Sequence, residues 1–186
     1  GAHCLWFVDG KYAHVTTGAG DFQPGNQLDD QFHMIVDMSN PEQPEEAGRW
    51  WLPGTRVGDS EAAPERQALD TGFRLHNVNV YPDHPDRAYM GYIDGGAIIV
   101  DISDMSNPSM ISRMDYHPPF PGFTHTALPL FDRGLMVVSD ESVREDASDH
   151  PKLVWIMDIR DEANPVIIST LPLPPADNYL YRKGRF

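Results

Sequence analysis

The sequence Ile99-Val100-Asp101-Ile102-Ser103, followed by Asn107-Pro108, decides the fold because versions of it occur three times in the chain. The other copies are Ile35-Val36-Asp37-Met38-Ser39-Asn40-Pro41 and Ile156-Met157-Asp158-Ile159-Arg160 with Asn164-Pro165. The copies recur at roughly 60 residues, and a repeat of this length built on strands is typical of propeller blades. Each unit is a small sheet that needs neighbouring units to bury its faces.

The aspartates of the three copies, Asp37, Asp101 and Asp158, are expected to be structural. Aspartate and asparagine side chains bond to their own backbone in turns, and a following proline ends strand pairing. Their repetition is therefore evidence for architecture rather than for catalysis.

Short strands account for the rest of each module. Asp9-Gly10 is a strong hairpin signal. The apolar runs 97–100 and 153–157 are short and bounded by turn residues, which favours buried strands over helices. The expected strands are 3–9, 11–17, 32–38, 46–52, 74–81, 87–94, 97–103, 109–116, 124–131, 134–140, 152–159 and 166–172.

These patterns predict an all-β fold, a β-propeller segment of three four-stranded blades. The modules are expected at approximately 1–54, 72–116 and 123–174, with a loop at 55–71 and a tail at 175–186. A closed propeller needs about four to eight blades. We therefore expect the ring to be completed by a second copy of the chain or by a complementary fragment.

The composition excludes one class of partner. The 186 residues include 28 acidic and 14 basic side chains, a formal charge of −14, whereas nucleic-acid binding needs a basic surface.

No apolar run approaches the ~20 residues that span a bilayer, so no membrane partner is expected. No signal peptide is recognisable in this chain, and a periplasmic or extracellular location stays open. Glycine-rich dinucleotide motifs are absent, so no nucleotide cofactor is indicated.

A histidine lies at or near the start of the first strand in each module. These residues are His3, His76 and His125. The first strand of a propeller blade lines the central axis, so the three imidazoles are expected to converge there. Converging neutral imidazoles form Zn, Fe or Cu sites. In the alternative interpretation, each histidine caps its strand and bonds to a neighbouring blade.

Acidic residues follow the second strands of two modules. Asp94, Asp140 and Glu141 are candidates for orienting a ligand ring or acting as a general base. His117, in a proline-rich segment that precedes the third histidine strand, is a candidate pocket wall or extra ligand. The polar stretches 53–73 and 141–151 are long loops, where binding residues tend to lie.

The Ile-Val-Asp strand followed by Asn-Pro resembles the LVIVD-repeat family of β-propeller proteins. The resemblance covers nearly the whole chain through the three copies. The family's His-Asn start to the first strand is matched at Leu75-His76-Asn77, whereas His3 and His125 are followed by Cys4 and Thr126. The resemblance implies a propeller fold, but no single activity is assigned to the family.

Two functional hypotheses follow. In the first, the protein is a metal-dependent enzyme that acts on a small organic molecule. His3, His76 and His125 bind Zn, Fe, Mn or Cu, and a further module supplies a fourth ligand. In the second, the protein is a non-catalytic interaction or ligand-binding scaffold whose loops 53–73 and 141–151 bind a partner.

Overall fold

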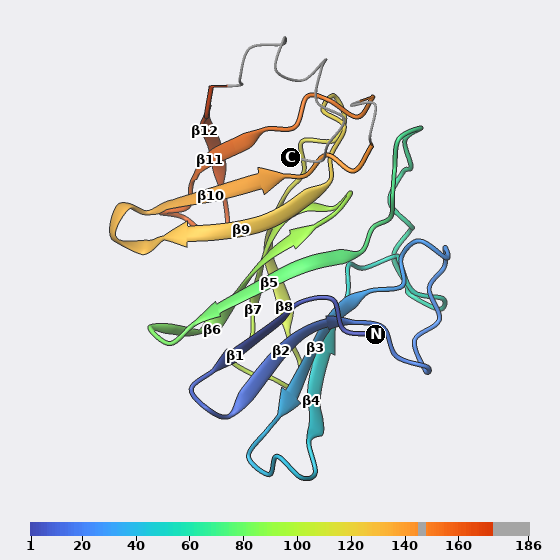
Figure 1. Ribbon diagram of the computed structural model, residues 1–186, viewed down its shortest axis with the longest axis vertical. Helices are drawn as coiled ribbons and strands as arrows, with labels where there is room; N and C mark the ends of the chain where they lie inside the picture. The colour runs from blue at the N-terminus through green and yellow to red at the C-terminus, as the bar shows by residue number, and fades with distance from the viewer. Residues whose placement is uncertain (145–147, 173–186) are drawn as a thin grey trace.

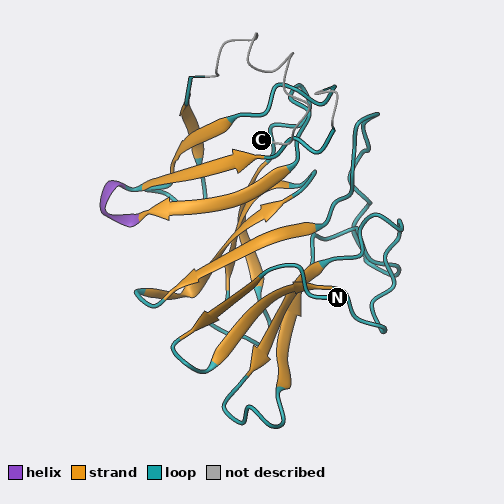
Figure 2. Cartoon of the chain, in the orientation of Figure 1, coloured by secondary structure: helices purple, strands orange, loops and turns teal. Residues whose placement is uncertain are grey.

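Three antiparallel sheets make up the computed structural model, which describes residues 1–144 and 148–172 (Figures 1 and 2). The first sheet contains β1 (Leu5–Val8), β2 (Tyr12–Thr17), β3 (Phe32–Asp37) and β4 (Glu45–Trp50). The second contains β5 (Leu75–Tyr81), β6 (His84–Tyr92), β7 (Gly96–Asp101) and β8 (Ser109–Met114). The third contains β9 (Thr124–Leu130), β10 (Leu135–Asp140), β11 (Val154–Asp158) and β12 (Val166–Thr170).

This architecture confirms the prediction of an all-β chain with three four-stranded sheets. Within the described residues, the only helix is the short 3-10 turn Phe131–Arg133 between β9 and β10, and no helix could span a membrane. The expected tail 175–186, the end of the third module and residues 145–147 of the loop 141–151 lie outside the described residues. The largest shift of a strand end is at β6, which begins at His84 because His84 pairs with Tyr81 across a tight turn.

The repeated aspartate ends the third strand of every sheet and forms the same turn each time. Its carboxylate accepts a hydrogen bond from the backbone N–H two residues later, which is the bond of an Asx turn. The bonds are Ser39 N to Asp37 (2.8 Å), Ser103 N to Asp101 (2.8 Å) and Arg160 N to Asp158 (3.0 Å). The structural role predicted for these aspartates is therefore confirmed.

Apolar side chains hold the sheets together in two layers. Val8, Ile35 and Trp50 of the first sheet pack with Leu75 and other residues of the second. A second cluster joins Tyr89 and Ile99 of the second sheet to Ala127, Met136 and Trp155 of the third. Burial of such side chains stabilises each layer by roughly 1.5–3 kcal/mol per large residue, so each sheet depends on its neighbour.

The first strands of the three sheets lie side by side, as Figure 1 shows for β1, β5 and β9. A glycine permits the close approach of β9 to the second sheet. A Cβ atom at Gly91 of β6 would lie only 2.3 Å from the backbone oxygen of His125. A larger residue at position 91 would therefore push away the strand that carries His125.

The two outermost faces of the stack carry exposed apolar side chains. Trp6 contacts Tyr81 of the second sheet, so its neighbours Leu5 and Phe7 point away from that sheet, and both are exposed. In the third sheet, Leu128 and Ile168 are likewise exposed. Apolar sheet faces of this kind are usually covered by another element.

Candidate functional site

Three histidines meet where the first strands of the sheets run together. His3 lies just before β1, and His76 and His125 are the second residues of β5 and β9. The Nε2 atoms of His3 and His76 are 3.0 Å apart. The rings of His76 and His125 lie with their centroids 3.9 Å apart. The structure thus brings together the three residues that occupy equivalent places in the repeats.

Glu141 completes the cluster from the segment after β10. Its Oε2 atom is 3.7 Å from Nε2 of His76 and 3.9 Å from Nε2 of His125. The Glu141 backbone N–H donates to the carbonyl of Phe123, which precedes β9, at 3.0 Å. One donor atom from each of His76, His125 and Glu141 lies within 4.8 Å of the others, close enough to share one ion.

Cys4 lies beside His3 and His76. Donor atoms of His3, Cys4 and His76 also lie within 4.8 Å of one another. The Asn77 amide donates to the Cys4 sulfur at 3.8 Å, and burial raises the pKa of the thiol. The thiol therefore stays protonated at neutral pH, and a metal would have to displace that proton before sulfur could bind. The isolated cysteine was a weak signal in the sequence.

Burial keeps the central imidazole neutral. The pKa of His76 is lowered to about 3, chiefly by burial and in part by the neighbouring His125, His3 and Arg74. Burial also lowers the pKa of His125, although the carboxylate of Glu141 opposes this shift. At neutral pH both rings therefore retain a nitrogen lone pair, which is the form that binds metals. The Nδ1 atom of His76 is buried and has no hydrogen-bond partner within the described residues.

The structure places Asp140 in a different set of contacts. Its carboxylate accepts hydrogen bonds from the Tyr116 hydroxyl, from Leu153 N at 3.1 Å and from the indole N–H of Trp155 at 2.9 Å. Burial raises the pKa of Asp140 to about 6. These bonds tie the end of β10 to the start of β11 and to the segment after β8, so Asp140 anchors the third sheet next to Glu141.

Asp94 also lies apart from the histidines, in the turn between β6 and β7. Its Oδ2 atom accepts the backbone N–H of Thr71 at 2.6 Å, and its neighbours include Asp70 and His117. Burial raises the pKa of Asp94 to about 7. Sequence reasoning identified Asp94 and His117 but missed Asp70. Asp70 belongs to a non-repeated linking stretch, and no pattern in the sequence distinguishes it from the other acids there.

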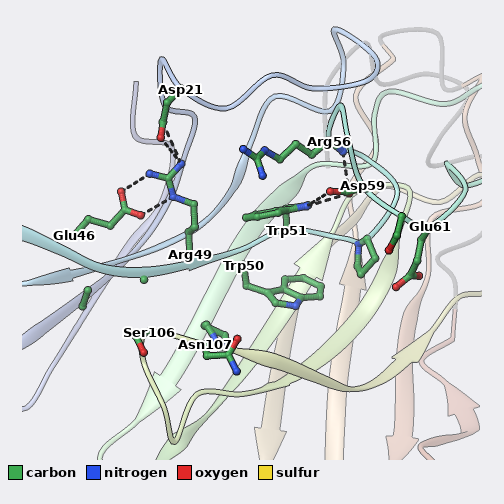
Figure 3. Close-up of a pocket in the computed structure, with 15 residues that line it drawn as sticks. Asp21, Glu46, Arg49, Trp50, Trp51, Arg56, Asp59, Glu61, Ser106 and Asn107 are labelled. Atoms are coloured by element: carbon green, nitrogen blue, oxygen red, sulfur yellow. Dashed lines mark hydrogen bonds and ion pairs between the residues drawn. The ribbon is translucent and has the colours of Figure 1, made fainter.

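A separate open cleft of about 760 Å³ lies at the outer edge of the first sheet (Figure 3). Its walls come from β4, from the linking stretch that includes Arg56 and Asp59, and from the turn between β7 and β8. The indole N–H of Trp51 donates to Asp59 at 3.1 Å, and the Arg56 guanidinium lies 5.0 Å from the Trp51 ring. This cleft includes part of the loop 53–73 that the sequence indicated as a binding region.

Comparison with known families agrees with this architecture. The profile of the LVIVD repeat matches residues 29–50, which include β3 and β4, and residues 78–116, which run from β5 through β8. The third copy of the motif lies outside the matched residues. A search of curated proteins gives no match. Parts of the first two sheets therefore match the LVIVD repeat, and the all-β architecture agrees with the β-propeller type of this repeat, as the sequence motifs predicted.

Proposed function

We propose that the protein binds a transition metal through His3, His76 and His125 and uses it in an enzymatic reaction on a small organic molecule. One observation carries the proposal: equivalent histidines from three sheets meet, with Nε2 atoms of two of them 3.0 Å apart. Two nitrogens on one tetrahedral zinc ion lie about 3.3 Å apart, given Zn–N bonds of about 2.0–2.1 Å. A small rotation of either ring would supply that spacing.

The electrostatics of the cluster support the proposal. The pKa values of His76 and His125 are lowered by burial, so no proton must leave these rings before a metal binds. Glu141 offers a carboxylate beside two of the rings, as a further ligand or as a general base. The imidazole set suits Zn, Fe or Cu, and the carboxylate extends this range to Mn. A metal held in such a site polarises a carbonyl group or activates water.

The net charge bears on the substrate. A formal charge of −14 favours the capture of cations and disfavours anionic molecules. The proposed substrate is therefore neutral or cationic.

Elemental analysis of the purified full chain tests the proposal. We expect at least one equivalent of Zn, Fe, Mn or Cu per chain, and we expect the double variant His76→Ala with His125→Ala to lose about one equivalent. His84→Ala is the matched control, because His84 begins β6 and stacks on Phe131. It pairs with Tyr81, at the end of β5 away from His76. Circular dichroism checks that each variant is folded. Negligible metal in the wild type, or equal metal in the double variant, would refute the proposal.

The cleft beside Trp51 favours a second candidate, a non-catalytic scaffold that binds a ligand or partner at the first sheet. In this case the histidines only join neighbouring sheets, through contacts such as the 3.0 Å bond between His3 and His76. The same elemental analysis separates the two candidates, because in a scaffold the replacement of His76 and His125 removes no metal.

We also propose that a second copy of the chain covers the exposed apolar faces at the ends of the stack. Leu5 and Phe7 on one face, and Leu128 and Ile168 on the other, are exposed sheet residues that a further blade would bury. Association of two chains would give about six blades, within the usual range for a closed propeller.

A further inference from the structure

A second group of buried titratable side chains lies between the linking stretch and the second sheet. Asp70 comes from the stretch that joins β4 to β5, Asp94 from the turn between β6 and β7, and His117 from the segment after β8. Asp94 is 1% exposed. The side chains of Asp70 and His117 are 4% and 5% exposed. Three segments that are distant in the sequence thus bury two carboxyl groups and one imidazole together.

In each of the two carboxylates, one oxygen accepts backbone hydrogen bonds, and the other oxygen makes none. Oδ2 of Asp94 accepts the backbone N–H groups of Thr71 at 2.6 Å and Gly72 at 2.5 Å. Oδ2 of Asp70 accepts the backbone N–H of Gln67 at 2.7 Å. The Oδ1 atoms of both aspartates are buried and make no hydrogen bond within the described residues. The backbone therefore fixes both carboxylates. Oδ1 of Asp70 pairs with His117, whereas Oδ1 of Asp94 has no polar partner within the described residues.

The imidazole of His117 lies close to both carboxylates. Oδ1 of Asp70 is 3.1 Å from Nε2 of His117, and one donor atom from each of the three residues lies within 4.8 Å of the others. The nearby Lys152 ammonium donates to the carbonyl of Gly122 at 2.8 Å and pairs with Asp149 at 3.6 Å. A buried carboxylate oxygen without a partner costs several kcal/mol, so Oδ1 of Asp94 calls for a cation.

A glycine keeps the space beside these atoms open. A Cβ atom at Gly122 would lie 3.4 Å from Oδ1 of Asp94 and 3.1 Å from the His117 ring. Any side chain at this position would therefore compete with a ligand of the three residues.

We propose that Asp70, Asp94 and His117 form a divalent cation site, separate from the histidine cluster. Two carboxylate oxygens and one imidazole nitrogen are a mixed set, in which the oxygens suit Mn²⁺ and the nitrogen disfavours Mg²⁺ and Ca²⁺. Mn²⁺ is therefore the expected ion. Three protein ligands leave further positions for water or for an oxygen atom of a substrate.

Titration of the chelator-treated full chain with MnCl₂ tests this site, with free Mn²⁺ measured by electron paramagnetic resonance. We expect Asp94→Asn to weaken Mn²⁺ binding by more than about 100-fold. Asparagine keeps an oxygen for the N–H groups of Thr71 and Gly72 but loses the charge and the free carboxylate oxygen. Asp104→Asn is the matched control, because Asp104 is an exposed acid that accepts Ser106 N in the turn between β7 and β8.

Two further measurements make the result decisive. In the background of the double variant His76→Ala with His125→Ala, Mn²⁺ is expected to raise the melting temperature of the protein and of its Asp104→Asn variant but not that of its Asp94→Asn variant. The double variant His76→Ala with His125→Ala should retain this Mn²⁺ site, so failure of the proposed histidine centre would not remove it. Equal Mn²⁺ affinity in Asp94→Asn and the wild type would overturn the proposal, as would a wild type that does not bind Mn²⁺.

Discussion

A buried pair of histidines in the first sheet makes the protein sensitive to acid. His14 of β2 and His33 of β3 are fully buried, and Nδ1 of His14 lies 3.0 Å from Nε2 of His33. Burial lowers the pKa of His14 to about 4, and it lowers the pKa of His33 well below its usual value. Neither histidine has an equivalent in the other two modules.

The direction of the pH effect on stability follows from the pKa of His14 in the folded and in the unfolded state. In the unfolded chain the pKa of a histidine is about 6.5, so the unfolded state takes up a proton first as the pH falls. The free energy of unfolding therefore decreases between pH 6.5 and about pH 4. For a pKa of about 4, the loss from His14 alone between pH 7 and pH 5 is about 2 kcal/mol.

Urea denaturation at pH 7 and pH 5, followed by tryptophan fluorescence, measures this loss in the wild type and in His14→Gln. Glutamine can still bond to His33 but does not titrate, so the decrease should be smaller in the variant by about 2 kcal/mol. Burial raises the pKa values of Asp94 and Asp140, and these groups favour the folded state as the pH falls. Asp94 and Asp140 are present in both proteins, so their contribution cancels when the decrease in the wild type is compared with that in His14→Gln.

His84→Gln, in a partly exposed position, is the matched control and should show the decrease of the wild type. If the free energy of unfolding fell equally between pH 7 and pH 5 in the wild type and in His14→Gln, this reasoning would be refuted. A directly measured titration midpoint of His14 near 6.5 would refute it as well.

Three further substitutions test other parts of the structure. Gly91→Ala would place a Cβ atom 2.3 Å from the His125 carbonyl oxygen, and we expect urea unfolding to show a loss of about 3 kcal/mol. Gly20→Ala, which meets no atom within 4 Å, is its control. Asp140→Ala leaves Leu153 N and the Trp155 indole without an acceptor, which should cost about 3 kcal/mol and alter tryptophan fluorescence. Leu128→Glu should convert a dimer to a monomer in sedimentation, whereas a monomeric wild type would contradict the second-copy proposal.

The strands were predictable because the repeats provide several copies of one pattern within a single chain. The three histidines were predictable for the same reason, since equivalent positions in adjacent blades lie near one another. The acids were harder to place, because their contacts depend on the paths of loops that do not repeat. Asp140 and Glu141 are adjacent, yet Asp140 bonds to Trp155 whereas Glu141 approaches His76 and His125. Consecutive residues of an extended chain point in opposite directions, and the sequence does not tell which one points inward.

The origin of the three histidines in three different sheets has a consequence for cooperativity. Stacked repeats interact only with their nearest neighbours, so their stabilities add up along the stack. A ligand bound by His3, His76 and His125 would connect the first sheet to the third across the second. When this ligand is bound, separation of any one blade from the others would break a bond to the ligand and so cost free energy. Binding at the inner strands would thus turn three units that can open locally into one that unfolds in a single step.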